Sequence, residues 1–298
     1  MREVRCRGTT ARHSQNIFKG IKSSLFMVAP YFKDVDFTLY KSDCVQALNE
    51  LPKNSVDLIF ADPPYFLSNG GISCRAGKMV LVNKADWDKS NGLENDFNFT
   101  LNWLTACKKV LKENGSIWIS GTMHNIYQVG YALQYLDYKI LNEISWFKPN
   151  APPNLSCRYF AHSHETLIWA RRNLDSRHTF NYEEMKDWAD KYGPKGKQMR
   201  SVWSIPLTPQ TEKLFGKHPT QKPLELLRRI ISSSSNKGDV VLDPFNGSGT
   251  TGVIAKELGR KYIGIDLENK FLDITMMRCG FSKEDLLTSK AVVSNKSN

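Results

Sequence analysis

Short runs of apolar, β-branched and aromatic residues recur along this chain of 298 residues, and patterns typical of helices separate several of them. The runs predict strands at residues 37–41, 56–61, 116–120, 140–147, 165–170, 239–243 and 261–265. The helical patterns lie at about residues 43–51, 99–112, 124–136, 223–233 and 251–258. Strands that alternate with helices imply a mostly parallel sheet covered on both faces, so the sequence predicts an α/β fold.

A tetrapeptide with reactive chemistry ends the apolar run at 56–61, where Asp62-Pro63-Pro64-Tyr65 follows directly. Open α/β sheets bind ligands at the carboxyl ends of their strands, so these residues are candidates for a reaction site. An aromatic amine is a poor nucleophile because its lone pair is delocalised. The Asp62 carboxylate and the Pro63 carbonyl could accept its N–H bonds and localise that lone pair, while Tyr65 offers a ring face for a base. The alternative is a purely structural Pro-Pro turn.

A second segment, at residues 240–252, combines an apolar strand, a glycine-rich turn and a helix start. Gly247, Gly249 and Gly252 satisfy the G-x-G-x-x-G spacing, and Asp266 follows the next strand, where it could bind a ribose. A dinucleotide-dependent oxidoreductase is therefore an alternative, and so is a glycine turn that serves packing alone.

Two observations argue against a dinucleotide. The carboxylate of Asp243 at the strand end would oppose a pyrophosphate, but it could suit a cationic sulfonium cofactor with an α-amino group. Only 298 − 266 = 32 residues follow Asp266, so the remaining strands of the sheet must come from earlier in the chain.

A third segment, His218-Pro219-Thr220-Gln221-Lys222-Pro223, precedes an apolar helix pattern. Pro223 suits a first helical turn. A helix start beside Thr220 and Lys222 could bind a carboxylate, as the methionyl end of S-adenosylmethionine (AdoMet) would need. Without the other two segments, it would be interpreted as a capped surface turn.

Taken in the order Asp-Pro-Pro-Tyr, His-Pro-Thr-Gln-Lys-Pro and Asp-Pro-Phe-Asn-Gly-Ser-Gly-Thr, these segments resemble the β group of DNA amino-methyltransferases from bacterial restriction–modification systems. The resemblance runs from about Thr38 to Cys279. It implies a seven-stranded, mostly parallel AdoMet-dependent methyltransferase sheet with one antiparallel strand, in a permuted order with the cofactor-binding unit C-terminal. It also implies methyl transfer from AdoMet to adenine N6 or cytosine N4 of a flipped base, and the aspartate that opens the tetrapeptide favours adenine.

The resemblance also implies roles for individual residues. The catalytic segment would be Asp62, Pro63, Pro64 and Tyr65. The cofactor-binding residues would be Asp43, Asp62, His218, Thr220, Lys222, Asp243, Phe245, Asn246, Gly247, Ser248, Gly249, Thr250 and Asp266.

The same pattern predicts a division of the chain: a basic N-terminal extension (1–35), a catalytic half (36–170) with a long polar loop (66–98), a target-recognition region (171–217), an AdoMet-binding half (218–280) and a tail (281–298). Residues 171–217 hold ten Lys and Arg against six Asp and Glu, with aromatic residues interleaved. Candidate DNA-binding residues are Lys78, Arg171, Arg172, Arg177 and Arg200, although surface charge explains each arginine about as well.

Composition bounds the partners. A net charge of +11 favours a polyanion, and DNA, duplex or single-stranded, is the expected one. Six scattered cysteines without a C-x-x-C pair predict neither disulfides nor a metal site. No run of eighteen apolar residues occurs, so a cytoplasmic protein without a membrane partner is expected. The resemblance adds a homodimer and a cognate restriction endonuclease as partners. A methyltransferase for RNA or a protein glutamine and a non-catalytic nucleic-acid-binding protein remain alternatives.

Overall fold

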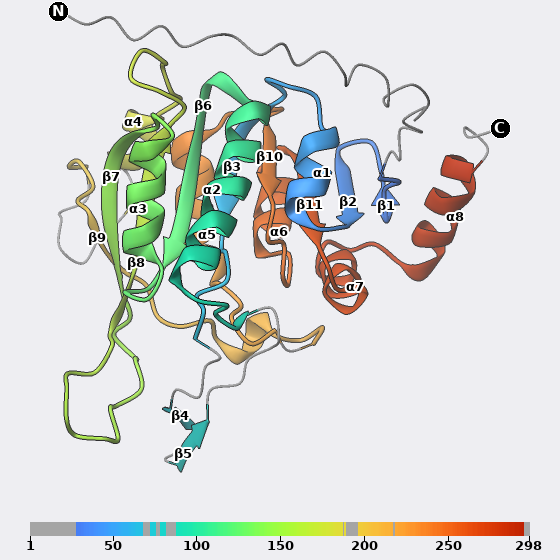
Figure 1. The fold of residues 1–298 in the computed structure, drawn as a ribbon. Helices are drawn as coiled ribbons and strands as arrows, with labels where there is room; N and C mark the ends of the chain where they lie inside the picture. The colour runs from blue at the N-terminus through green and yellow to red at the C-terminus, as the bar shows by residue number, and fades with distance from the viewer. Residues whose placement is uncertain are drawn as a thin grey trace, which may run out of the picture.

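The computed structural model describes residues 28–67, 72–75, 78–81, 88–186, 188, 196–216 and 218–294. Within these residues, one large sheet forms the centre of the molecule (Figure 1). Its strand order is β1-β2-β11-β10-β3-β6-β8-β7-β9. The strands are β1 (Phe32–Lys33), β2 (Phe37–Lys41), β3 (Val56–Ala61), β6 (Leu111–Gly121), β7 (Lys139–Phe147), β8 (His164–Arg171), β9 (Val202–Ser204), β10 (Val240–Asp243) and β11 (Lys261–Asp266).

The seven central strands, from β2 to β7 in the sheet order, confirm the predicted methyltransferase sheet. Neighbouring strands from β2 to β6 pair in parallel, and β8 pairs antiparallel with both β6 and β7. The described chain adds two short edge strands that the sequence pattern did not predict. β1 has two residues and β9 has three, too few for a periodic pattern.

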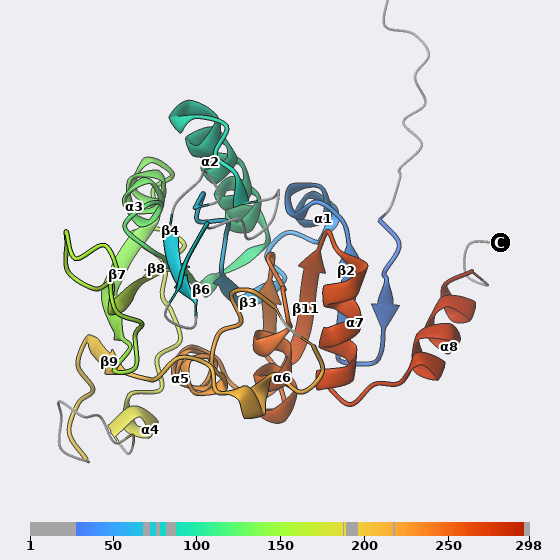
Figure 2. The same cartoon turned by 90° about the horizontal axis from the view of Figure 1, so that it is seen from below.

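Helices cover both faces of the sheet (Figure 2). The helices α1 (Cys44–Glu50), α2 (Leu93–Val110) and α3 (Ile126–Tyr135) pack on one face, and α5 (Leu224–Ser234), α6 (Thr250–Glu257) and α7 (Asn269–Arg278) pack on the other. Successive side chains of a strand point to opposite faces. In β3, accordingly, Leu58 and Phe60 join one core, while Ile59 and Ala61 join the other.

Several segments contain more regular structure than the sequence indicated. The polar loop predicted at 66–98 includes the hairpin β4 (Ile72–Arg75) and β5 (Lys78–Leu81) and the start of α2. The region predicted for target recognition at 171–217 includes α4 (Tyr182–Lys186), β9 and a short 3-10 helix (Gln210–Glu212), and the predicted tail at 281–298 includes α8 (Lys283–Ser294). Residues 1–27 of the predicted basic extension lie outside the described residues. No helix in the described chain is both long and apolar enough to span a membrane.

Candidate active site

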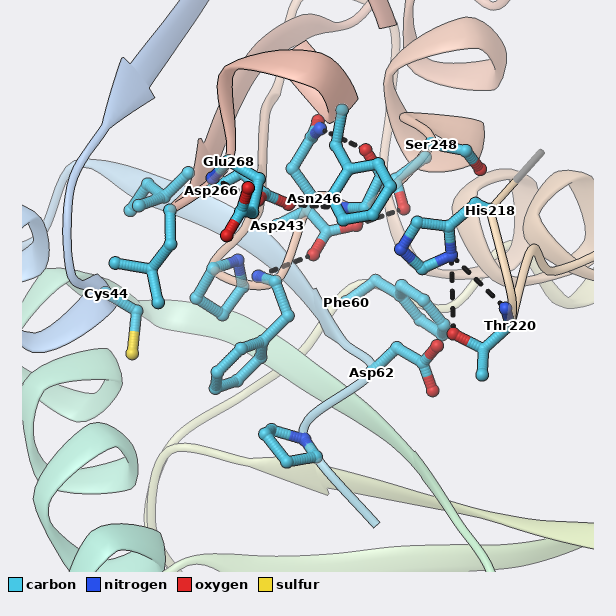
Figure 3. A pocket seen from close by; sticks show the side chains of 18 of the residues that line it. Cys44, Phe60, Asp62, His218, Thr220, Asp243, Asn246, Ser248, Asp266 and Glu268 are labelled. Carbon is cyan, nitrogen blue, oxygen red and sulfur yellow. Dashed lines mark hydrogen bonds between the residues drawn. The ribbon is translucent and has the colours of Figure 1, made fainter. Parts of the chain in front are cut away.

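A cavity of about 370 Å³ lies at the carboxyl ends of β2, β3, β10 and β11, and the three sequence motifs meet around it (Figure 3). Of the residues predicted from the sequence, those that line it are Asp43, Asp62, Pro64, His218, Thr220, Lys222, Asp243, Phe245, Asn246, Gly247, Ser248, Thr250 and Asp266. Pro63, Tyr65 and Gly249, all in the described chain, are not part of the lining.

The glycine turn between β10 and α6 forms one wall because it has no space for side chains. Gly249 has a φ of +71°, and a Cβ there would lie 2.4 Å from the side chain of Thr275. Gly247 has a φ of +51°, and a Cβ there would lie 3.1 Å from the ring of His218. Only glycine adopts such a backbone readily and tolerates such close approach. The turn can therefore bring its backbone against the segment that contains His218.

Two acids, the buried Asp243 and the half-buried Asp266, accept hydrogen bonds beside this turn. Asp243 accepts from the Phe245 amide at 3.0 Å and from the Thr251 hydroxyl at 2.6 Å. Asp266 accepts from the Gly247 amide at 2.8 Å. Burial raises the pKa of Asp243 to about 7 and the pKa of Asp266 to about 6, against the opposing effect of these hydrogen bonds. A bound cation would favour the ionised form of both acids, so they suit a positively charged ligand.

The rest of the lining also fits AdoMet. Five phenylalanine rings line the cavity and provide apolar walls for an adenine: Phe60, Phe66, Phe99, Phe245 and Phe271. Asp43 is the N-cap of α1, where its carboxylate accepts from two backbone amides. The volume falls within the range of about 300–1,000 Å³ typical of small-molecule sites. The cavity thus combines acids for a sulfonium, an α-amino group and a ribose with aromatic surface for a base.

Asp62, directly after β3, lies between two donors. The Lys222 ammonium is 2.5 Å from Oδ2, and the Tyr65 hydroxyl donates to Oδ1 at 2.7 Å. Burial by itself would lower the pKa of Lys222, but the nearby Asp62 and Glu165 carboxylates outweigh that effect and raise it. Lys222 was predicted from the sequence to bind a cofactor carboxylate. In the structure, Lys222 lines the cavity and its ammonium pairs with Asp62, because a buried cation needs a counter-ion.

Tyr65 also differs from the sequence-based hypothesis of an open ring face for a base. The side chain is 5% exposed, and its hydroxyl contacts Ser120 at 2.8 Å and Glu165 at 3.2 Å. The ring is therefore buried with its hydroxyl among polar partners, which a buried phenol needs. The next residue, Phe66, takes a φ of +58° and lines the cavity instead.

The backbone after the tetrapeptide is fixed by an acid from a distant part of the chain. The amides of Tyr65 and Phe66 donate to Asp88 Oδ1 at 2.8 and 2.9 Å. The Asn125 side chain donates to the Pro64 carbonyl at 3.3 Å. These contacts hold the candidate catalytic segment in place from two sides.

Sequence reasoning missed a second carboxylate beside Asp62. Glu165, at the start of β8, lies 2.6 Å from the ammonium of Lys148 and 3.7 Å from that of Lys222. Burial by itself would raise the pKa of Glu165, but Lys222 and Lys148 outweigh burial and lower it. We use the term Asp62 network for this buried group, which consists of Asp62, Tyr65, Ser120, Lys148, Glu165 and Lys222. The available signal was an acid at the first position of the strand predicted at 165–170.

The candidate DNA-binding arginines do not reach the cavity. Arg171 donates to the Leu174 carbonyl at 2.7 Å, and Arg172 donates to the carbonyl of Leu111, the first residue of β6, at 2.8 Å. Because β8 runs antiparallel to β6, both arginines lie at the opposite ends of the strands from Asp62. The other candidates lie elsewhere on the described chain: Arg177 is exposed after β8, Arg200 is exposed before β9, and Lys78 begins β5, with its side chain outside the described part of the structure.

Comparison with known proteins supports this interpretation of the cavity. The family model described as DNA methylase, N6_N4_Mtase, matches residues 56–277. The Type II methyltransferase M2.DpnII of Streptococcus pneumoniae is 52% identical over 255 residues, which cover 85% of this chain and 93% of that protein.

Solved structures show the same fold. The complex of M1.HpyAVI with SAM is 26% identical, with a TM-score of 0.59, over 81% of this chain and 98% of that one. The cytosine-N4-specific PvuII DNA methyltransferase is 17% identical, with a TM-score of 0.67, over 89% of this chain and 95% of that one. With these matches over most of its length, the chain belongs to the N6/N4 DNA methylase family, and it is an AdoMet-dependent DNA methyltransferase.

Proposed function

We propose that the chain is the adenine-N6 methyltransferase of a restriction–modification system and that Asp62 binds the amino group that receives the methyl. The observation that carries this proposal is the position of Asp62. Its carboxylate ends β3 at the wall of the same cavity that the glycine turn lines. A target amine bound to Asp62 would therefore lie next to the bound cofactor.

AdoMet, when bound, would supply a methyl group on a sulfonium: as the amine nitrogen bonds to the methyl carbon, the carbon–sulfur bond would break, the sulfur would leave as a neutral thioether and the amine would release one proton. Asp243 and Asp266 would bind the positively charged and ribose parts of the cofactor, with His218 and Thr220 near its methionyl end. Asp43 and the phenylalanine rings would hold the adenine. The glycine turn at Gly247–Gly249 would leave room for the cofactor against the backbone.

Asp62 and the Pro63 carbonyl would accept the two N–H bonds of the target amine. A carboxylate has about four lone-pair sites, so Asp62 can accept a further hydrogen bond while Lys222 and Tyr65 occupy two of them. The Asp62 network would hold the carboxylate still, so catalysis rests on position and electrostatics. The target base must leave the helix stack to reach this cavity, because its amine is buried there.

Cysteine-based attack on a base ring is a poor alternative. Cys44 lines the cavity, but burial raises the pKa of its thiol to about 12. The thiol therefore stays protonated at neutral pH, and the thiolate is the nucleophilic form.

Cytosine N4 is the second candidate target, since the fold is shared with a cytosine-N4-specific enzyme. The aspartate at the head of the tetrapeptide favours adenine. We also propose a homodimer, a restriction endonuclease that acts on the same site, and action on the chromosome in the cytoplasm, in line with the bacterial Type II relative.

Expression of the chain in bacteria without native adenine methylation tests the target base. Mass spectrometry of the digested DNA should show N6-methyladenine, and modified-base sequencing should give the recognition site. Detection of N4-methylcytosine without N6-methyladenine would show that the target base is cytosine rather than adenine. Absence of any methylated base in both experiments would reject the proposal.

A further inference from the structure

The loop between β7 and β8, residues 148–163, lies at the same sheet edge as Asp62. Ala61, the last residue of β3, pairs with Ile119 near the end of β6, and Gly121 pairs with Thr166 near the start of β8. The end of β7 and the start of β8 therefore meet this edge beside the Asp62 network. In Figure 1, the loop projects beyond the sheet on the side of the β4–β5 hairpin.

The base of this loop is tied into the Asp62 network. The Lys148 amide donates to the Ser163 carbonyl at 2.7 Å, which closes the loop. The Lys148 ammonium and the Glu165 carboxylate, one at each end of the loop, form the 2.6 Å ion pair described above. Because Glu165 also contacts the Tyr65 hydroxyl, the loop and the catalytic segment share one set of contacts.

The middle of the loop is organised by its own hydrogen bonds. The Asn154 side chain accepts from the amide and the hydroxyl of Ser156 at 3.0 and 2.8 Å. It also donates to the Tyr159 carbonyl at 2.5 Å. Such side-chain contacts to the local backbone hold a turn without a strand or helix.

This turn presents aromatic side chains to solvent. Phe160 is 96% exposed, and Tyr159 is 58% exposed. No Asp or Glu occurs between Lys148 and His164, whereas Arg158 directly precedes Tyr159 and Phe160 in the sequence. An acid-free aromatic and basic surface matches single nucleotides, whose bases stack on aromatic rings and whose phosphates attract arginine.

We propose that the β7–β8 loop binds the DNA strand next to the target nucleotide, with Phe160 stacked on a neighbouring base. The proposal rests on the proposed function and adds a contact outside the methyl-transfer cavity. It adds to the candidate DNA-binding arginines a loop whose flanking residues Lys148 and Glu165 belong to the Asp62 network.

Fluorescence anisotropy with labelled random-sequence oligonucleotides, single-stranded and annealed, tests this contact. Phe160→Ala should weaken binding of at least one form by about 5- to 150-fold, the range to which loss of one stacked base corresponds. Phe160→Trp keeps a stacking surface and should bind within about threefold of the parent protein. Tyr135→Ala removes another exposed aromatic, 65% exposed at the end of α3, and should leave binding unchanged.

Equal affinity of the Phe160→Ala and parent proteins for both DNA forms would overturn the proposal. The proposal would also be overturned if Tyr135→Ala lost as much DNA affinity as Phe160→Ala. A second assay, methyl transfer from labelled AdoMet to unmethylated bacterial DNA by the parent protein, distinguishes failure of the loop contact from failure of the proposed function. If the parent protein methylates DNA but Phe160→Ala binds DNA as tightly as the parent, only the loop contact is rejected. If the parent protein methylates no DNA, the proposed function is rejected.

Discussion

Asp62 shares its strongest donor with another carboxylate. Lys222 lies 2.5 Å from Asp62 and 3.7 Å from Glu165, so its charge is divided between two acids. Glu165 is in turn held by Lys148 at 2.6 Å. This sharing limits how far Lys222 weakens Asp62 as a hydrogen-bond acceptor for an amine. We therefore expect Glu165 to act as a positioning residue through Lys222 and Tyr65.

Glu165→Gln should reduce kcat by about 10- to 100-fold, because Lys222 would then neutralise Asp62 alone and hydrogen bonds to charged groups contribute about 1.5–3 kcal/mol. The dissociation constant for AdoMet should stay within about threefold. Glu165→Asp should recover part of the rate. Steady-state kinetics and AdoMet titration check these values, with Glu257→Gln as a control that removes an exposed ion pair to Arg228. A lower melting temperature with unchanged kcat would contradict the role.

Asp243 makes stability depend on pH. Its folded-state pKa is raised to about 7 by burial, while the ordinary value is 3.8. An acid with a raised pKa binds more protons in the folded state, so it stabilises the fold at low pH and that contribution is lost as pH rises towards 7.

The measured quantity is the unfolding free energy of the cofactor-free parent protein minus that of the cofactor-free Asp243→Asn variant. This difference should be smaller at pH 7.5 than at pH 4.5. The expected fall is about 2–4 kcal/mol, since one unit of pKa corresponds to about 1.4 kcal/mol. Urea unfolding at both pH values measures this difference. A difference that stays constant or grows with pH would show that the pKa of Asp243 is not raised in the folded protein.

At the scale of elements, apolar patterning located the central strands closely. The prediction at 37–41 and at 56–61 matches β2 and β3 at both ends, and 261–265 misses one residue of β11. The helices α7 and α8 were not predicted, although α7 carries the buried apolar residues Phe271, Leu272 and Met276. The pattern also failed for the β4–β5 hairpin, whose strands have four residues each.

The glycine turn before α6 shows what a pattern can and cannot predict. The spacing of the glycines indicated a turn that binds a cofactor or serves packing, but not that Thr275 of α7 is the neighbour of Gly249. That contact belongs to packing between elements.

Gly249→Ala should destabilise the protein more than Gly280→Ala. Both residues have positive φ, +71° and +77°, so each alanine carries a backbone cost of about 1–2 kcal/mol. A Cβ at Gly280 meets nothing within 4 Å, whereas one at Gly249 meets Thr275 at 2.4 Å. Chemical denaturation should show at least about 1 kcal/mol more loss for Gly249→Ala, in line with the cost of overpacking. Equal losses would mean that the turn does not depend on this contact.

At the scale of the whole molecule, the order of three motifs was enough to indicate the family and the cavity. Two motifs follow strand ends, the tetrapeptide after β3 and the glycine turn after β10, and parallel strands present those ends at one edge of the sheet. The third motif, His218–Pro223, leads into α5. The Asp62 network could not be predicted in this way. Ser120, Lys148 and Glu165 come from three further segments. The parallel pairing of β6 with β3 brings Ser120 to Tyr65, and the antiparallel pairing of β8 with β6 and β7 brings Glu165 and Lys148 there.

The account as a whole depends on Asp62 as the residue that binds the target amine beside AdoMet. Asp62→Asn keeps the size of the side chain and one acceptor for Tyr65 or Lys222, but it removes the charge. Single-turnover methylation of DNA by this variant, together with AdoMet titration, measures the claim directly. We expect the methyl-transfer rate to fall by about 10²–10³-fold, as for loss of other preorganised electrostatic groups, with AdoMet affinity within a few-fold of the parent protein. Methylation by Asp62→Asn at the parent rate would contradict the account.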